Sequence, residues 1–439
     1  MKTVSVSDVA IPVLGGTPKR GIPSYWNGSI KWATAKDVAN SKGRYLFSTA
    51  ETITEEGLNN SAAKILPKGT VIITARGTVG AIAQLGENMA FNQTCYGLVP
   101  KDTNKIDQNY LYYALKASIQ EMRAVSYGTV FDTITMKSFD EIQIPLPPLP
   151  EQKAIAHILG TLDDKIELNR RMNETLEEMA KAIFKSWFVD FDPVIDNALK
   201  AGNPIPDTLA EKAARRRAIL EKLEKEDPNL PKFPPEVTRL FPDSFEDSPL
   251  GPVPRGWRVW KIGDLAHVTS GQRPSMVSEN WSDETPIPIF GGGGVQGYTE
   301  EPLYRNSILI TGRVGTLGQI FRVTYPCWPS DNTLVIIPAE DSYFHFVYQQ
   351  LKRTNLENLN RGSTQPLITQ KDAKNIQFVI SEDQVLVTYH KYIEKVYRKI
   401  DQNNQEIKAL ASIRDTLLPK LISGQIRIKD AEKFLGKVL

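Results

Sequence analysis

The feature that most constrains this chain is a long heptad-patterned segment that the sequence contains twice. The first copy, residues 151–188, follows a proline-rich run, and apolar residues or asparagines recur at alternating spacings of four and three. The second copy lies near the C-terminus. Asn403 stands 234 positions after Asn169, and Ile400 stands 234 positions after Ile166, so both copies share one register. The repeat positions are Leu162, Ile166, Asn169, Leu176 and Ile183, then Ile400, Asn403, Ile407, Leu410 and Leu417.

This pattern predicts two long helices that pair as a coiled coil. A polar residue among the apolar repeat positions costs stability but fixes register and partner, so the matched asparagines favour mutual packing. We expect an antiparallel pair with Asn169 and Asn403 near its middle, because each helix follows its own copy of a preceding domain. The alternative is two unrelated amphipathic surface helices.

The segments before the two helices are also related. Residues 260–274 match residues 4–18, with Gly271 lying 256 positions after Gly15. Further matches join residues 309–320 to 72–83, residues 330–338 to 91–100, and residues 361–369 to 127–135. A repeat of this size indicates tandem duplication in the order domain, helix, domain, helix. Strand-like and helix-like stretches mix without regular alternation, so we predict an α+β fold.

These patterns set the predicted boundaries. The segment 191–252 is rich in proline and acid, which indicates an extended linker that carries one short charged helix. The cluster Arg215–Arg217 on that helix is interpreted as a solvated face. The predicted parts are residues 1–150 and 253–382 as domains, 151–190 and 383–425 as spacer helices, 191–252 as linker and 426–439 as tail.

Composition excludes several classes of protein. No apolar run is long enough to span a membrane, and the two cysteines, Cys95 and Cys327, fit a reducing cytoplasm rather than a disulfide scaffold. No spacing of histidine, cysteine or acid suits a metal. Gly292, Gly294 and Gly297 satisfy a dinucleotide-binding pattern but lack the strand–turn–helix context that it needs. We find no catalytic constellation.

The net charge of +2 does not announce a nucleic-acid partner, so DNA contact has to be argued from local patches. Cations interleaved with aromatics in the first domain suit a phosphate backbone, and arginines and amides in matched loops suit base edges. The alternatives are a solvated loop face, structural turn arginines and turn-capping amides. The candidates are Lys19, Arg20, Tyr25, Lys36, Arg44, Arg76, Gln93 and Thr129 in the first copy, and Gln272, Arg273, Arg313, Asn332, Arg361 and Thr364 in the second.

Four stretches carry a resemblance to a known family. They are residues 145–194, with PLPPLPEQKAIAHILGTLDDKIELNRRMN, residues 240–265, with LFPDSFEDSPLGPVPRGWRVW, the glycine-rich GGGGVQGYTEE with TGRVGTLGQI, and residues 414–428. Over essentially its whole length the chain resembles the DNA-specificity subunit of type I restriction-modification systems.

The resemblance implies two target-recognition domains in tandem, each reading half of a split, asymmetric double-stranded DNA sequence. It implies that the two long helices form an antiparallel spacer, so that the two repeats are related by a pseudo-two-fold axis. This spacer would dock two methyltransferase subunits. Restriction and translocase subunits would join that complex. S-adenosylmethionine, ATP and Mg²⁺ would belong to those partners, so this chain is expected to hold no cofactor or metal and to be cytoplasmic.

Three other interpretations stay open. The chain could serve a modification-only or related system, which the co-purification of a motor subunit would decide. A coiled-coil scaffold without a DNA role would show no duplex binding with its partners present. A nucleotide-dependent enzyme would require measurable cofactor binding by the isolated chain.

Overall fold

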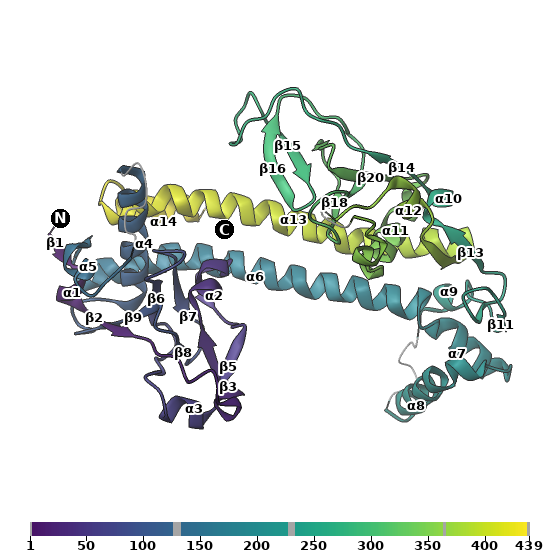
Figure 1. The fold of residues 1–439 in the computed structure, drawn as a ribbon, viewed down its shortest axis with the longest axis horizontal. Helices are drawn as coiled ribbons and strands as arrows, with labels where there is room; N and C mark the ends of the chain where they lie inside the picture. Colours follow the sequence, from purple (N-terminus) through teal and green to yellow (C-terminus); the bar gives the residue numbers. More distant parts are fainter. Residues whose placement is uncertain (1, 126–132, 227–232, 363–365, 437–439) are drawn as a thin grey trace. The chain divides into compact units, whose positions relative to one another are not determined.

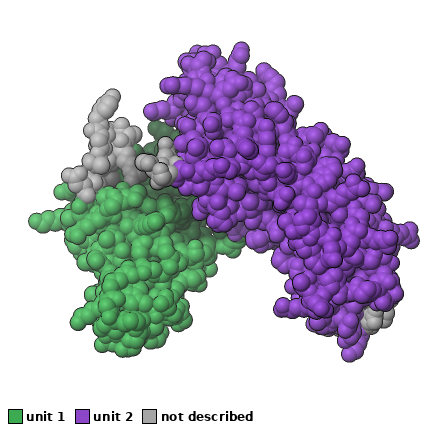
Figure 2. Space-filling model, turned by 45° about the vertical axis from the view of Figure 1, so that its right-hand side comes forward, with its two compact units in different colours: residues 1–173, 401–439 green, residues 174–400 purple. Residues whose placement is uncertain are grey.

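The computed structural model describes residues 2–125, 133–226, 233–362 and 366–436. The chain forms two compact units, residues 1–173 with 401–439 (unit 1) and residues 174–400 (unit 2), which Figure 2 colours separately. Each unit holds one of the repeated domains. Among the described residues, no helix is both long and apolar enough to cross a membrane.

Unit 1 is built on a five-stranded sheet in the order β2–β9–β6–β7–β4. Its central strand β6 has the run VIIT and is buried at every position, as a strand covered on both faces requires. A second sheet, β5–β3–β8, and the pair β1–β10 complete the domain (Figure 1). The strands are β1 Thr3–Ser5, β2 Ala10–Leu14, β3 Trp26–Ala33, β4 Tyr45–Leu46, β5 Glu51–Ile53, β6 Val71–Thr74, β7 Ile82–Leu85, β8 Ala90–Phe91, β9 Cys95–Pro100 and β10 Gln143–Pro145. The helices are α1 Val6–Val9, α2 Ala35–Asn40, α3 Glu55–Asn59, α4 Gln108–Val125 and α5 Ser138–Glu141.

Unit 2 repeats this plan. Its main sheet runs β14–β20–β17–β18, its second sheet β16–β15–β19, and β13 pairs with β21. The strands are β13 Arg258–Lys261, β14 Ala266–Ser270, β15 Ile287–Gly291, β16 Gly294–Thr299, β17 Ile308–Gly312, β18 Ile320–Val323, β19 Trp328–Pro329, β20 Thr333–Pro338 and β21 Gln377–Ile380. The helices are α10 Ile262–Leu265, α11 Asp341–Arg353 and α12 Gln370–Lys374. The predicted duplication and α+β fold are therefore confirmed.

One glycine in each unit shows how closely the copies agree. A Cβ added at Gly15, just after β2, would lie 2.2 Å from the Asn92 carbonyl oxygen, and one at Gly271, just after β14, would lie 2.2 Å from the Ser330 carbonyl oxygen. Both glycines are the matched pair of the sequence repeat. No other residue fits where two backbone segments approach so closely.

The two long helices are α6 (Leu149–Phe188) and α13 (Asp383–Ile422). In unit 1, Arg414 donates to Asp163 at 2.6 Å and Asn403 donates to Asn173 at 2.8 Å. In unit 2, the ring centroids of Trp187 and Tyr389 lie 5.9 Å apart. In unit 1 the residue numbers rise along α6 as they fall along α13, so the antiparallel pairing is confirmed.

The predicted repeat positions line the contact between these helices. In unit 1, Leu162, Ile166, Leu410 and Leu417 are buried and Ile407 is partly buried; in unit 2, Ile400 is buried and Leu176 and Ile183 are partly buried. Asn169 and Asn403 are both buried but do not bond to each other. Asn169 donates to Glu406 at 2.9 Å, whereas Asn403 donates to Asn173. Antiparallel packing sets these positions one helical turn apart.

The linker carries the short charged helix that the sequence predicts, α8 (Ala210–Glu226), but much of the rest is not extended as predicted. It forms α7 (Asp192–Ala201), α9 (Pro235–Thr238) and the hairpin β11 (Phe245–Glu246) with β12 (Val253–Pro254). Val194 and Phe241 are buried, and the Phe241 ring packs edge-on to Trp187 at 5.2 Å. Arg216 is not on a solvated face: it is buried and donates to Asp196 at 2.8 Å. The predicted tail contains a further helix, α14 (Ile428–Leu435).

We expect Arg414→Met to destabilise unit 1. Asp163 is 4% exposed and accepts from both Arg414 and the Tyr113 hydroxyl, so removal of the guanidinium leaves a buried carboxylate without its cation. Breaking a buried pair from one side costs about 3–5 kcal/mol. The matched control is Lys181→Met, whose partner Glu178 is exposed and whose loss should cost under about 1 kcal/mol. Thermal unfolding of both variants is the measurement, and equal melting temperatures would contradict the expectation.

We also expect Gly15→Ala to lower the free energy of unfolding by about 1–3 kcal/mol, because the new methyl group forces two backbone segments apart. Gly21→Ala is the control, since no atom lies within 4 Å of its added Cβ. Hydrogen exchange of β2 and β9 amides localises the effect. Unchanged protection in Gly15→Ala would show that this close approach is not required.

Candidate nucleic-acid interface

Three loops meet at one end of the main sheet in each unit. In unit 1, β2 and β6 end there and β9 begins there; in unit 2, β14 and β17 end there and β20 begins there. In unit 1 the Gly16 amide donates to the Phe91 carbonyl at 2.9 Å, and the Ala75 amide donates to the Thr94 carbonyl at 2.7 Å. In unit 2 the same two bonds join Gln272 to Pro329 at 3.0 Å and Arg313 to Asn332 at 2.8 Å. We call this the loop edge: residues 15–18, 75–80 and 92–94 in unit 1, and 271–274, 313–318 and 330–332 in unit 2.

Glycines shape the middle loop of each edge. Gly77 and Gly80 in unit 1 have φ values of 77° and 78°, and Gly315 and Gly318 in unit 2 have 81° and 87°. These left-handed conformations suit glycine. The middle loop is therefore a short turn of defined backbone conformation at the end of its strand. The side chains of this loop project from that strand end.

A tryptophan braces each loop edge from a different strand. The Trp32 indole on β3 donates to the Gly16 carbonyl at 2.9 Å, and the Trp328 indole on β19 donates to the equivalent Gln272 carbonyl at 2.7 Å. In unit 1, Trp32 of β3 pairs with Ala90 of β8. In the corresponding pair of unit 2, Ile289 of β15 pairs with Trp328 of β19, so the tryptophan lies on the other strand of the pair. Sequence reasoning missed this role, because the two tryptophans do not align in the repeat.

Several predicted DNA-contacting residues lie together on the loop edge. Arg76 and Gln93 are exposed in unit 1, and Gln272, Arg273 and Asn332 are exposed in unit 2. Arg313 is half-buried there. These side chains offer donors and acceptors at one end of each sheet.

The strand register corrects one expected correspondence. Ala10 pairs with Pro100 and Ala266 pairs with Pro338, which makes Asn332 equivalent to Thr94 rather than to Gln93. By the same register Arg313 is equivalent to Ala75, one residue before Arg76. The sequence match had aligned Arg313 with Arg76 because both are arginines that lie two residues after a threonine, and this alignment is shifted by one residue from the strand register.

The basic, aromatic segment of unit 1 lies beside the loop edge and is partly neutralised. Arg20 pairs with Glu51, which raises the pKa of Arg20, and its guanidinium stacks 4.0 Å from the Trp26 ring centroid. Lys19 and Lys36 are exposed, and Tyr25 is half-buried. Lys19 and Lys36 therefore present their ammonium groups at the surface, while Arg20 is held by its partners.

Arg44 is not a DNA-contacting residue, contrary to the prediction. It is 6% exposed, its guanidinium bonds to Gln84 and to Asn109 at 2.6 Å, and it lies 5.1 Å from the Tyr113 ring centroid. A Cβ on Gly160 of α6 would approach it at 2.9 Å. Arg44 is thus a structural cation between the sheet, α4 and α6.

Arg361 is exposed but forms an ion pair with Asp372. Burial alone would raise the pKa of Asp372, but hydrogen bonds from Thr369 and the charge of Arg361 bring it below its ordinary value. The pair ties the loop before α12 to that helix. Thr129 and Thr364, also predicted to contact DNA, lie outside the described residues.

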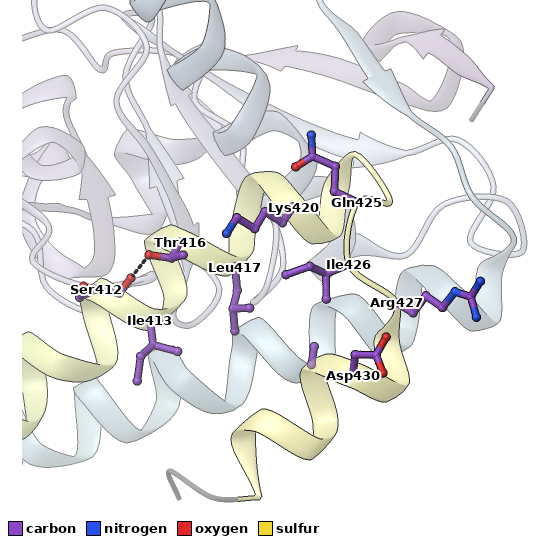
Figure 3. Close-up of a pocket in the computed structure, with 10 residues that line it drawn as sticks. Ser412, Ile413, Thr416, Leu417, Lys420, Gln425, Ile426, Arg427 and Asp430 are labelled. Carbon is purple, nitrogen blue, oxygen red and sulfur yellow. Dashed lines mark hydrogen bonds between the residues drawn. The ribbon is translucent and has the colours of Figure 1, made fainter.

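The described side chains form no set suited to holding a metal ion. Burial raises the pKa of the Cys95 and Cys327 thiols to about 12, so both stay protonated and are poor nucleophiles. A cavity of about 550 Å³ lies between the end of α13 and α14 (Figure 3). Ile413, Leu417 and Ile426 line it together with the charged Lys420 and Asp430.

Comparison with known proteins finds a family whose members are DNA specificity subunits. The family model of the type I restriction modification DNA specificity domain matches residues 1–178 and 254–412. The type I restriction enzyme MjaIX specificity subunit of Methanocaldococcus jannaschii is 26% identical, with 97% of this chain and 93% of the relative covered. The HindI specificity subunit of Haemophilus influenzae is 28% identical, with 91% and 94% covered.

Among solved structures, the type I restriction-modification S subunit of M. genitalium has a TM-score of 0.56 and 18% identity over 96% of each chain, which supports the fold. The family model covers well over half of the sequence, in the two regions that contain the repeated domains. The chain therefore belongs to the type I restriction-modification DNA specificity family.

Proposed function

We propose that this chain is the non-catalytic, sequence-reading subunit of a type I restriction-modification complex. In this proposal the loop edge of each unit contacts one half of a two-part double-stranded DNA target. The observation that carries it is the presence of two equivalent loop edges on one chain. They share a backbone frame but carry different exposed side chains.

The differences between the edges favour an asymmetric target. Unit 1 offers Arg76 and Gln93, whereas unit 2 offers Gln272, Arg273 and Asn332. Arginine pairs well with guanine and amides pair well with adenine, so different sets select different bases. Lys19 and Lys36 suit the phosphate backbone, which positions the protein without reading sequence.

Two methyltransferase subunits would dock on the helices α6 and α13. The repeat positions themselves are covered by the opposite helix, so docking would use exposed apolar side chains elsewhere on these helices. Leu168 and Met179 on α6 and Val387 on α13 are each about half exposed. Restriction and translocase subunits would join the complex, and the partners would bring S-adenosylmethionine, ATP and Mg²⁺.

The decisive experiment reconstitutes this chain with the modification subunits of its own system and maps methylated adenines in a genome. A two-part sequence with an unspecified gap is expected. The same complex is then tested by competition binding between a duplex with that sequence and a scrambled duplex. Equal affinity for both would contradict the proposal.

We expect each unit to determine only its own half of the target. Exchanging residues 258–380 for the matching segment of the H. influenzae relative should change one half-site and leave the other unchanged, because base contacts are local to each loop edge. The exchange begins after Trp257, whose ring lies 5.7 Å from Phe191 of the retained segment. Thermal unfolding checks that the hybrid folds, and the reciprocal exchange of residues 3–145 is the matched control. Simultaneous change of both half-sites would show that the units do not read independently.

A further inference from the structure

Three positions at or directly beside the loop edge carry opposite chemistry in the two units. Leu14 pairs with Tyr96 and Ser270 pairs with Leu334, which makes Ser270 the counterpart of Leu14. The Ile134 amide donates to the Ala75 carbonyl at 3.0 Å, and the Ile368 amide donates to the Arg313 carbonyl at 2.9 Å. Arg313 is therefore the counterpart of Ala75, and Gln370 is the counterpart of Met136.

In unit 2 the three side chains form a polar set. The Ser270 hydroxyl is contacted by Arg313 Nη1 at 3.2 Å and by Gln370 Nε2 at 3.0 Å. All three residues are half-buried. Arg313 Nε is buried and has no hydrogen-bond partner among the described residues. The contact between Nη1 and Ser270 thus holds the guanidinium in place, and the buried Nε itself is not accessible to a base.

In unit 1 the equivalent set is apolar. Leu14 is 46% exposed and Met136 is 52% exposed, although both could have been polar at no cost to the core, while Ala75 is buried. Exposed apolar side chains of this size, at a strand end that is otherwise polar, indicate a surface that contacts a binding partner. The backbone frame is the same, so only the contacting surface has changed.

We propose that these positions select the base pair at corresponding points of the two half-sites, which rests on the proposed function. Arg313, oriented by Ser270 and Gln370, reads guanine through its O6 and N7 acceptors. Leu14 and Met136 receive the thymine methyl group. The set is a base selector because a phosphate contact is independent of sequence and would need a donor in both units, whereas unit 1 has none at these positions.

The first test substitutes Arg313 and measures binding by the reconstituted methyltransferase complex to duplexes that vary one base pair at a time. Arg313→Ala should relax the preference for guanine at one position of one half-site, by about 5- to 150-fold. Arg313→Lys keeps the charge and can still donate to guanine but loses the planar fork, so it should lose less of this discrimination than Arg313→Ala and retain most affinity. Arg305→Ala, an exposed arginine of unit 2 outside the loop edge, should leave the preference unchanged.

The second test moves the unit 1 set into unit 2 as Ser270→Leu, Arg313→Ala and Gln370→Met. The preference at the same base pair should change from G·C to T·A, and all other positions should stay as they were. Thermal unfolding and methylation at the altered target show that the triple variant folds. If that variant does not fold, the two single substitutions of Arg313 still decide the question.

Two results would overturn the proposal. A uniform loss of affinity for every sequence in Arg313→Ala, with a reduced salt dependence, would assign Arg313 to a phosphate. An unchanged preference in all variants would assign the set no role in recognition. Failure of the proposed function has a different signature, since the unsubstituted complex would then show no preferred sequence at all.

Discussion

The structure depends on the antiparallel packing of α6 against α13, because each globular domain closes its core on that pair. In unit 1 the core joins Leu162 and Leu410 of the helices to Tyr110 of α4 and Ile144 of β10. In unit 2 the core joins Phe184 and Tyr389 of the helices to Phe346 of α11. A change in helix register would therefore disturb both cores.

Buried polar contacts add specificity to this apolar packing. Asp163 of α6 accepts from Tyr113 of α4 and from Arg414 of α13, which links three helices at one carboxylate. Unit 2 uses different groups for the same purpose: Gln349 of α11 donates to Tyr397 of α13 at 2.7 Å, and His345 contacts Glu394 at 2.7 Å. Such contacts make a shifted register costly, because it would leave buried polar groups unpaired.

The loop edges show how a duplicated fold keeps its frame and changes its surface. Gly15 and Gly271 preserve a close backbone approach, and an indole braces the same carbonyl in both units from different strands. The frame is set by backbone hydrogen bonds, which do not depend on side chains at the edge. The positions of Leu14 and Ser270 can therefore diverge without loss of the fold.

The sequence by itself determined the helix pair, the duplication and the α+β class, because heptad spacing and matched glycines are local patterns that survive in the order of residues. Tertiary structure alone decided which cations are buried and paired. Arg44 and Arg216 look like surface charges in the sequence, but distant residues such as Asn109 and Asp196 bury and pair them. Tertiary structure also decided that Arg313 is equivalent to Ala75, because strand pairing, and not residue identity, determines which positions of the two units are structurally equivalent.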